Sequence, residues 1–351
     1  MKDLTSLGER SIIETLLVPR YGNQDDFGDD CCVIPLNKTK CLVATIDPCP
    51  KPMSWILGYN DYYYFGWLLA TINLSDIAAM GAQPLGLLTS YIMENETSVE
   101  NFKRLLDGMD AACNQAGTTV LGGNLKEAKF FSCEASAFGI GNPNKLIRRK
   151  GAKVGDAIVV IGDLGFFWSG VLYSKNKLQL SKIESDKILM NVLTPRAKIK
   201  EGIIISKDCL LSSGMDNSDG LYPSFKELAT QNSVDFMIDF SQVNWDPTVL
   251  KISKKLKIDP IRFGLGWGDW QLVGTVPTEK LIKLTETMAT VGTTVNIVGK
   301  VESGTGSVHL SHLGRKGIMT PFDSERFSHN SWFTIGIDSY IKDLLEKSLF
   351  V

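Results

Sequence analysis

The sequence LLATINLSDIAAMGAQP (residues 68–84) places a carboxylate inside a long apolar run. The segment 62–80 has the composition of a buried helix, and Gly81 would end that helix as a C-cap. Asp76 could itself be a helix cap, but only about one turn would follow it before Gly81. Asn73 lies three residues earlier and so shares a helix face with Asp76. This polar pair indicates a functional site, because a buried carboxylate is costly unless it is paired or bound to a metal.

Other aspartates occur in similar surroundings, beside apolar or glycine-rich sequence. They stand in FGDDCCVIPL, at the end of CLVATID and in MDNSDGL: Asp29, Asp30, Asp47, Asp216 and Asp219. Oxygen-rich clusters with few histidines or cysteines suit Mg²⁺, which proteins usually hold with a few carboxylates and a bound phosphate chain. The set therefore indicates nucleotide chemistry.

Taken singly, these motifs have ordinary structural explanations. GDDCC (28–32) could be an aspartate-rich turn, and DNSDGL (216–221) could cap a helix. A helix N-terminus can also hold phosphate, so a cap and a site are compatible. The combination of the motifs is a stronger indication than any one of them.

The glycine-rich stretches TVLGGN and GLGWGDWQL match neither GxxxxGK[ST] nor GxGxxG in the required setting, so we expect tight turns there. Arg148 and Arg149 could form a solvated junction or contact phosphate. Trp267 and Trp270 could be core residues or could stack on a flat ring.

Composition limits the class of protein. The 351 residues suffice for two domains with sizeable cores. A net charge of −2 and a pI near 6.0 provide no general attraction to nucleic acid or anionic membranes. No apolar stretch reaches the ~20 residues that span a bilayer, and the N-terminus has early acidic residues.

The seven cysteines do not have the paired spacing of metal ligands. Cysteines without such spacing are typical of reduced thiols, so we expect a cytoplasmic protein. The three histidines all fall late in the chain, which disfavours a histidine triad or zinc site.

Hydrophobic periodicity predicts mixed helices and strands in both halves. In the first half we expect helices over 4–17, 62–80 and 99–117 and strands over 31–36, 41–47, 84–93, 118–124 and 130–141. In the second half we expect helices over 184–206, 221–231, 278–291 and 334–349, and strands over 157–162, 234–240 and 294–301. We also expect strand-and-turn segments over 212–220 and 264–276, and a loop-rich tail over 302–333. A basic, glycine-containing junction over 146–165 would separate domains 1–148 and 149–351, so the fold class is α+β (mixed α/β) in two domains.

Together these residues resemble the family of thiamine-monophosphate kinase. That family belongs to a superfamily with aminoimidazole ribonucleotide synthase, selenophosphate synthetase and the hydrogenase maturation factor that dehydrates a carbamoyl group. The matching segments follow the family's order over nearly the whole chain: GDDCC (28–32), ATID (44–47), INLSDIAAMGAQP (72–84), LGGN (121–124), RKGAKVGD (149–156), TPRAKIKEG (194–202), DNSDG (216–220) and GDWQL (268–272). INLSDIAAMGA is specific alone, and the rest are specific as an ordered set.

The resemblance implies a fold like that of aminoimidazole ribonucleotide synthase. Its N-terminal domain would pair into a dimeric β-barrel, and ATP would bind in the cleft beside a C-terminal α/β domain. By analogy, Mg²⁺ ions bridging the ATP phosphates would be held by Asp29, Asp30, Thr45, Asp47, Asp76, Asp216 and Asp219, of which Asp216 and Asp219 are also the expected catalytic residues. Further contacts to the nucleotide are expected from Asn73, Gly122, Gly123, Asn124, Arg149 and Ser218, with Arg149 facing a phosphate.

The sequence also departs from the family pattern. The kinase family's glycine pair is followed by Asp, where this chain has Asn124, which brings no charge to a metal. The kinase's GGEDYEL is replaced by GWGDWQL (266–272), and the segment 48–65 is atypical. The ATP half of the site is therefore expected to be retained and the acceptor half to be remodelled.

These observations predict an ATP- and Mg²⁺-dependent phosphotransferase with a divergent small-molecule acceptor, acting as a homodimer without nucleic acid or membrane partners. One alternative is a synthase that activates an amide or carboxyl oxygen by phosphorylation, because it would share every metal ligand. The second alternative is a nucleotide-binding regulatory protein that has lost turnover, which Asn124 and GWGDWQL favour and the six aspartates disfavour.

Overall fold

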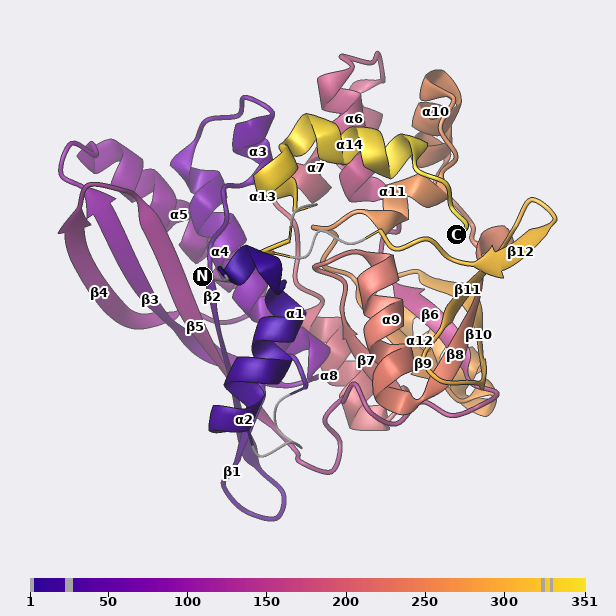
Figure 1. Cartoon of the computed structure of the whole chain (residues 1–351). Coiled ribbons are helices and arrows are strands. Elements are labelled where there is room, and N and C mark those ends of the chain that lie inside the picture. The colour runs from indigo at the N-terminus through magenta and orange to yellow at the C-terminus, as the bar shows by residue number, and fades with distance from the viewer. Residues whose placement is uncertain (1–2, 23–27, 323–325, 329–330) are drawn as a thin grey trace.

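Two sheets with helices around them make up a mixed α+β fold (Figure 1). The computed structural model describes residues 3–22, 28–322, 326–328 and 331–351. The first sheet comes from the N-terminal part of the chain and the second from the C-terminal part, as the sequence predicts. Within these described ranges, no helix combines the length and the apolar character that crossing a membrane requires.

The N-terminal sheet has five strands in the order β1-β2-β5-β3-β4. Its strands are β1 (Cys32–Pro35), β2 (Cys41–Pro48), β3 (Gln83–Glu94), β4 (Val120–Ala128) and β5 (Ser132–Gly141). All pairs are antiparallel except β3 with β4, which is parallel. Along β2 the inward side chains of Cys41 and Val43 are fully buried, while Ile46 on the opposite face is 63% exposed. One face of the sheet therefore packs on a core and the other is open.

Helix α4 (Tyr62–Ala79) lies between the two halves of the molecule and is buried on nearly every side. It contacts β2, β5 and α5 (Val99–Gln115) in the first half, and α8 and β7 in the second. Gly66 permits the close approach of α5, since a Cβ there would lie 1.8 Å from the carbonyl oxygen of Leu105. The all-apolar pattern predicted this burial, and the predicted and observed helix bounds differ by one residue.

The C-terminal sheet has seven strands in the order β12-β11-β8-β10-β6-β9-β7. Its strands are β6 (Ala157–Ile161), β7 (Ser213–Asp216), β8 (Val234–Asp239), β9 (Leu272–Val276), β10 (Val295–Ser303), β11 (Val308–His312) and β12 (Arg315–Ile318). The helices of this half are α6 (Phe166–Lys175), α7 (Lys182–Leu193), α8 (Ile199–Asp208), α9 (Leu221–Asn232), α10 (Pro247–Leu256), α11 (Ile261–Leu265), α12 (Leu281–Thr290), α13 (Trp332–Ile335) and α14 (Ile337–Glu346).

The sequence-based predictions differ from the structure at several places in this half, and α10 and α11 were also not predicted. The helix expected over 184–206 is two helices, α7 and α8, because Pro195 cannot continue a helix and restricts the residue before it. Helix α6 was missed, since its first seven residues are all buried and show no polar face. The tail over 302–333 contains β11 and β12 where loops were expected.

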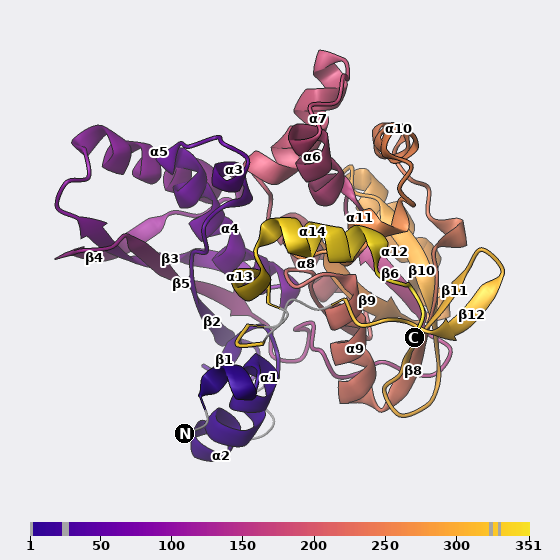
Figure 2. The same ribbon diagram turned by 45° about the horizontal axis from the view of Figure 1, so that its top comes forward.

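Short helices from the two ends of the chain lie near the line where the halves meet (Figures 1 and 2). At the N-terminus these are α1 (Glu9–Ile12), a π-helical turn (Ile13–Leu17) and α2 (Val18–Tyr21). The remaining short elements are α3 (Met53–Ile56) and 3₁₀ turns at Leu4–Ser6, Phe240–Gln242 and Thr278–Lys280. The backbone N–H of Glu9 donates to the carbonyl oxygen of Arg326 at 3.0 Å, which connects the two ends of the chain.

Candidate active site

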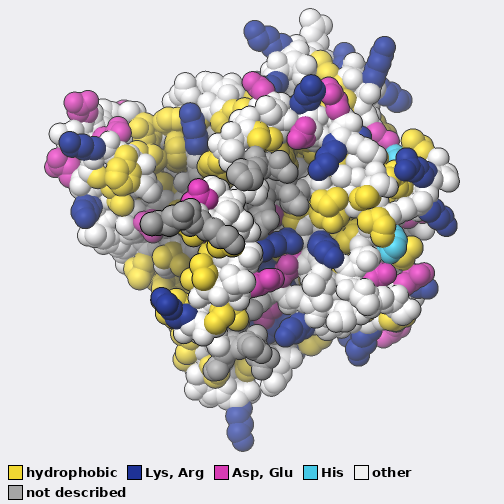
Figure 3. Space-filling model, in the orientation of Figure 1, with side chains coloured by type: hydrophobic (Ala, Val, Ile, Leu, Met, Phe, Trp, Pro, Cys, Tyr) yellow, Lys and Arg dark blue, Asp and Glu magenta, His cyan; other side chains and the backbone are white. Residues whose placement is uncertain are grey.

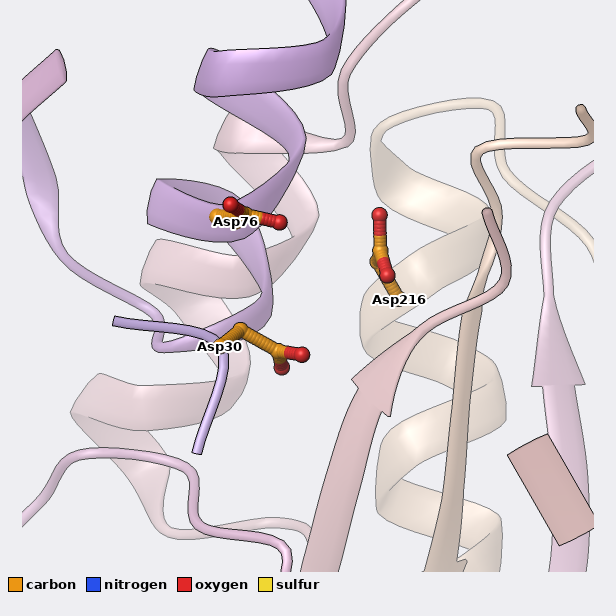
Figure 4. Close-up of side chains that lie close together, drawn as sticks. All are labelled: Asp30, Asp76 and Asp216. Carbon is orange, nitrogen blue, oxygen red and sulfur yellow. The ribbon is translucent and has the colours of Figure 1, made fainter. Parts of the chain in front are cut away.

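Three carboxylates from distant parts of the sequence meet where the two halves join. Asp30 precedes β1, Asp76 is in the last turn of α4, and Asp216 ends β7. One oxygen atom from each carboxylate lies within 4.8 Å of the others. Figure 4 shows the three side chains directed toward one another. The structure thus brings together three of the seven residues predicted to hold metal ions.

Hydroxyl groups fix the carboxylates of this cluster. Thr45 Oγ1 donates a 2.6 Å hydrogen bond to Asp76 Oδ2. Asp216 accepts from two serines, with 2.7 Å from Ser75 Oγ to Oδ2 and 3.0 Å from Ser218 Oγ to Oδ1. Thr45 and Ser218, both predicted to add oxygen atoms to the site, therefore lie beside the carboxylates.

Burial makes the negative charge of this cluster expensive. It raises the pKa of Asp216 to about 7, to which the charge of Asp30 also contributes. Burial, followed by the charges of Asp216 and Asp47, raises the pKa of Asp76 well above its usual range. Two charges 4.8 Å apart repel by about 3 kcal/mol at an effective dielectric constant near 20. Three such pairs are comparable to the whole stability of a typical domain, roughly 5–15 kcal/mol, so the ionised cluster requires protons or bound cations.

Asp47 and Asp219 extend the acidic surface beyond the cluster, and both line the adjoining cleft. Burial raises the pKa of Asp47 to about 6, with Arg326 opposing and Asp219 adding to the shift. Asn73 holds this segment in place: its Oδ1 accepts the backbone N–H of Asp47 at 3.1 Å, and its Nδ2 donates to the carbonyl oxygen of Leu69 at 3.0 Å. Asn73 is fully buried and holds the backbone of Asp47, and its expected contact with the nucleotide stays a prediction.

The adjacent Asp29 and Asp30 are ion-paired with the two arginines of the domain junction. Arg148 Nη1 donates to Asp29 Oδ2 at 2.7 Å, and the backbone N–H of Arg149 donates to Asp29 Oδ1 at 2.8 Å. The guanidinium of Arg149 bonds to Asp30 Oδ1. Burial raises the pKa of Asp30, and the charge of Arg149 opposes that shift. Both arginines thus pair with aspartates next to the cluster, and a contact between Arg149 and phosphate stays a prediction.

Asp76 and Asp216 line a cleft of about 1330 Å³. Residues of α1, α2 and the basic junction contribute to its lining, including Arg148, Arg149 and Lys150. Apolar and aromatic side chains also line it: Met53, Phe167, Trp267, Trp270, Trp332 and Phe333. Figure 3 shows acidic and basic side chains gathered in the middle of this face of the molecule. The cleft thus combines charged and aromatic side chains in its lining.

The structure does not bring Gly122, Gly123 and Asn124 to this cluster within one chain. All three are exposed on β4, an edge strand three positions away from β2 in the sheet. At about 4.8 Å per strand, the separation is roughly 14 Å. Figure 1 shows β4 at the far edge of the N-terminal sheet.

Sequence reasoning missed two contributions to the site. Ser75 was given no role in the site, although its position next to Asp76 in an apolar helix marked it as a buried polar residue. Glu227, on α9, lies 3.8 Å from the guanidinium of Arg149 and lines the cleft. No motif surrounds Glu227, so only the fold could reveal it.

The chain matches known domains over most of its length. Residues 28–141 match the AIR synthase related protein, N-terminal domain, and residues 153–311 match the corresponding C-terminal domain. The two matched ranges contain every residue predicted for the site except Arg149, which lies between them.

Three relatives illustrate the similarity. Thiamine-monophosphate kinase of Pyrococcus horikoshii is 28% identical over 307 residues, which cover 86% of this chain and 91% of that protein. Thiamine-monophosphate kinase of Methanocaldococcus jannaschii is 32% identical over 253 residues, covering 69% and 76%. The solved structure of AaThiL complexed with AMPPCP and TMP has a TM-score of 0.78 and 24% identity, covering 93% of this chain and 99% of that one.

Proposed function

Because this chain belongs to the AIR synthase related family and is a thiamine-monophosphate kinase-like, ATP-dependent phosphotransferase, we propose that Mg²⁺ bound by its carboxylate cluster holds the ATP phosphates. The observation that carries the proposal is the convergence of Asp30, Asp76 and Asp216 beside a large cleft. The phosphoryl group would pass from ATP to an acceptor bound beside the aromatic side chains of that cleft.

The residues present fit Mg²⁺. The cluster offers only oxygen ligands, which Mg²⁺ prefers, and no histidine or cysteine belongs to it among the described residues. Asp30 Oδ2 is buried and has no hydrogen-bond partner in the part of the chain that the structure describes, so it retains a free lone pair for a cation. When bound, Mg²⁺ would supply positive charge that neutralises the phosphate oxygens during transfer.

The chain's own residues would orient the reactants. Thr45, Ser75 and Ser218 fix the oxygen atoms of Asp76 and Asp216. Asp29, Asp47 and Asp219 are proposed as further ligands, because they line the same cleft. Such pre-organisation matters more than a strong base, because phosphoryl transfer depends mainly on positioning and charge stabilisation.

We propose an acceptor other than thiamine monophosphate. AaThiL has been solved with TMP, which makes that compound the first acceptor to test. In this chain Trp267 and Trp270 line the cleft, and Trp267 stacks on Trp332 with ring centroids 5.1 Å apart. The remodelled segment GWGDWQL therefore adds indole rings to the lining of the cleft.

The test is a turnover assay with ATP, Mg²⁺ and thiamine monophosphate, run beside a panel of amide and carboxylate acceptors and an untargeted metabolite screen. We expect ATP-dependent phosphorylation of a compound in the screen and little or no product from thiamine monophosphate. Formation of thiamine diphosphate at about 1 per second or faster would restore the ordinary kinase assignment.

A homodimer through the N-terminal sheet completes the proposal. The open face of that sheet carries several exposed apolar side chains: Ile34, Ile46, Leu85 and Leu88. A face of this kind is expected to be covered by another copy of the chain, closing the two sheets into a β-barrel. Gly122–Asn124 would then reach a carboxylate cluster only in the assembly. The domain boundary between residues 148 and 149 is also proposed, since it separates the two sheets.

A further inference from the structure

Arg149 links Asp30, which precedes β1, to helix α9 of the C-terminal half. Its guanidinium bonds to Asp30 Oδ1, while Asp30 Oδ2 is left buried and free of hydrogen bonds among the described residues. The side chain of Asp30 is 2% exposed and that of Arg149 is 20% exposed. A carboxylate held through one oxygen has its second oxygen in a fixed direction.

Helix α9 of the C-terminal half holds Arg149 in turn. Glu227 Oε1 lies 3.8 Å from Arg149 Nη1 and accepts a 2.7 Å hydrogen bond from Gln231. Gln231 also donates to the carbonyl oxygen of Gly28 at 3.0 Å, just before the two aspartates. Asn232 Nδ2 donates to the carbonyl oxygen of Arg149 at 2.8 Å. One face of α9 therefore fixes both the backbone and the side chain of Arg149.

We propose that Arg149 is a positioning residue for the metal site: it acts through Asp30, whose free oxygen it directs toward the ion, and it thereby couples α9 to the carboxylate cluster. The inference rests on the proposed function, because it presumes that the cluster binds Mg²⁺. It goes beyond the expected contact between Arg149 and a phosphate, since it predicts an effect on metal binding without any nucleotide.

Two other roles for Arg149 would give a different result for metal binding when the arginine is removed. If its guanidinium only contacted phosphate, removing it would leave the binding of the bare metal ion unchanged. If it were a cation that competes with the metal for Asp30, removing it would strengthen metal binding. A positioning role requires that metal binding weaken, because an unsupported Asp30 can turn its carboxylate away from the cluster.

The test is titration of the nucleotide-free chain with Mn²⁺, with free Mn²⁺ measured by electron paramagnetic resonance. Arg149→Gln is expected to weaken Mn²⁺ binding about 10–100-fold, the scale on which partners of metal ligands act. The matched control is Arg104→Gln, which removes an arginine from an ion pair with Asp61 at the N-terminal end of α4, whereas Asp76 is near its C-terminal end. We expect that control to bind Mn²⁺ like the unaltered chain.

A double substitution separates a specific effect from general damage. If Arg149 acts through Asp30, then Asp30→Asn combined with Arg149→Gln should bind Mn²⁺ as weakly as Asp30→Asn alone. Additive losses, unchanged binding or tighter binding in Arg149→Gln would each overturn the inference. If Arg149→Gln does not fold, Arg149→Met replaces it, since it also removes the bond to Asp30, and unchanged Mn²⁺ binding by that variant would overturn the inference equally. Absence of Mn²⁺ binding by the unaltered chain would overturn the proposed metal cluster and this inference with it.

Discussion

Ser75 Oγ donates a 2.7 Å hydrogen bond to Asp216 Oδ2, which joins helix α4 of the N-terminal half to strand β7 of the C-terminal half. Both residues are almost completely buried. The bond therefore links the two halves at the place where the carboxylates meet, and it fixes one oxygen of a proposed metal ligand.

Replacing Ser75 should cost stability as well as function. A hydrogen bond to a charged buried group is worth about 1.5–3 kcal/mol, so Ser75→Ala is expected to lower the free energy of unfolding by about 2 kcal/mol. Urea denaturation at pH 8 would measure this loss. Ser169→Ala is the matched control, because Ser169 is equally buried but donates only to the carbonyl oxygen of Phe166. An equal loss of unfolding free energy in both variants would show that the hydrogen bond to Asp216 contributes no more than a bond to a backbone carbonyl.

The metal-free cluster should be a source of instability. Asp76 has its pKa raised by burial and by the neighbouring charges of Asp216 and Asp47. Asp76→Asn keeps an oxygen for the hydroxyl of Thr45 and removes the charge. In EDTA at pH 8 we expect this variant to be more stable than the unaltered chain, by about 1–4 kcal/mol. A lower thermal midpoint than that of the unaltered chain would contradict this account of the repulsion.

The same electrostatics predicts the pH dependence of stability without metal. Burial raises the pKa of Asp216 to about 7 and that of Asp47 to about 6, above the usual value near 3.9 in an unfolded chain. The folded state then binds more protons than the unfolded state between about pH 4 and pH 7. Stability from these groups is therefore present at low pH and lost as the pH rises through 6 and 7.

Thermal unfolding from pH 5 to 8 checks this dependence. In EDTA the loss should be smaller for Asp216→Asn than for the unaltered chain. Excess Mg²⁺ should offset the loss at pH 8, since the ion binds the ionised carboxylates. Identical pH profiles with and without Mg²⁺ would contradict the prediction.

The open sheet face gives a prediction about assembly. The unaltered chain should be a dimer at micromolar concentration by light scattering, and Ile46→Asp should be a monomer, because it places a charge on the proposed interface. Ile183→Asp is the control, since Ile183 is 83% exposed on α7 in the other half of the chain. A monomeric mass for the unaltered chain would refute the proposed dimer.

Much of this architecture could be predicted from local patterns. The buried helix carrying Asp76 follows from an apolar run with a glycine stop, and alternation along CLVATID predicts a strand with one buried face. The convergence of Asp30, Asp76 and Asp216 was predicted only through the ordered resemblance to a family. Spacing alone cannot bring together residues 46 and 140 positions apart.

The misses have physical causes. A run as uniformly apolar as that of α6 has no periodicity that would separate a helix from a strand, so it was overlooked. The contact of Asn73 could not be predicted, because sharing a helix face with Asp76 does not indicate that its Oδ1 accepts the backbone N–H of Asp47. Asn124 lies on an edge strand away from the cluster within one chain, and no local pattern in the sequence indicates that separation.

We propose that Asp30, Asp76 and Asp216 bind Mg²⁺, which would hold the phosphates of ATP. Calorimetric titration with a non-hydrolysable ATP analogue tests it most directly, using the unaltered chain with Mg²⁺, the unaltered chain in EDTA, and the folded Asp76→Ala variant with Mg²⁺. We predict binding in the first case, and at least tenfold weaker binding in the other two, a difference of about 1.4 kcal/mol or more. Equal affinity in all three titrations would contradict the account.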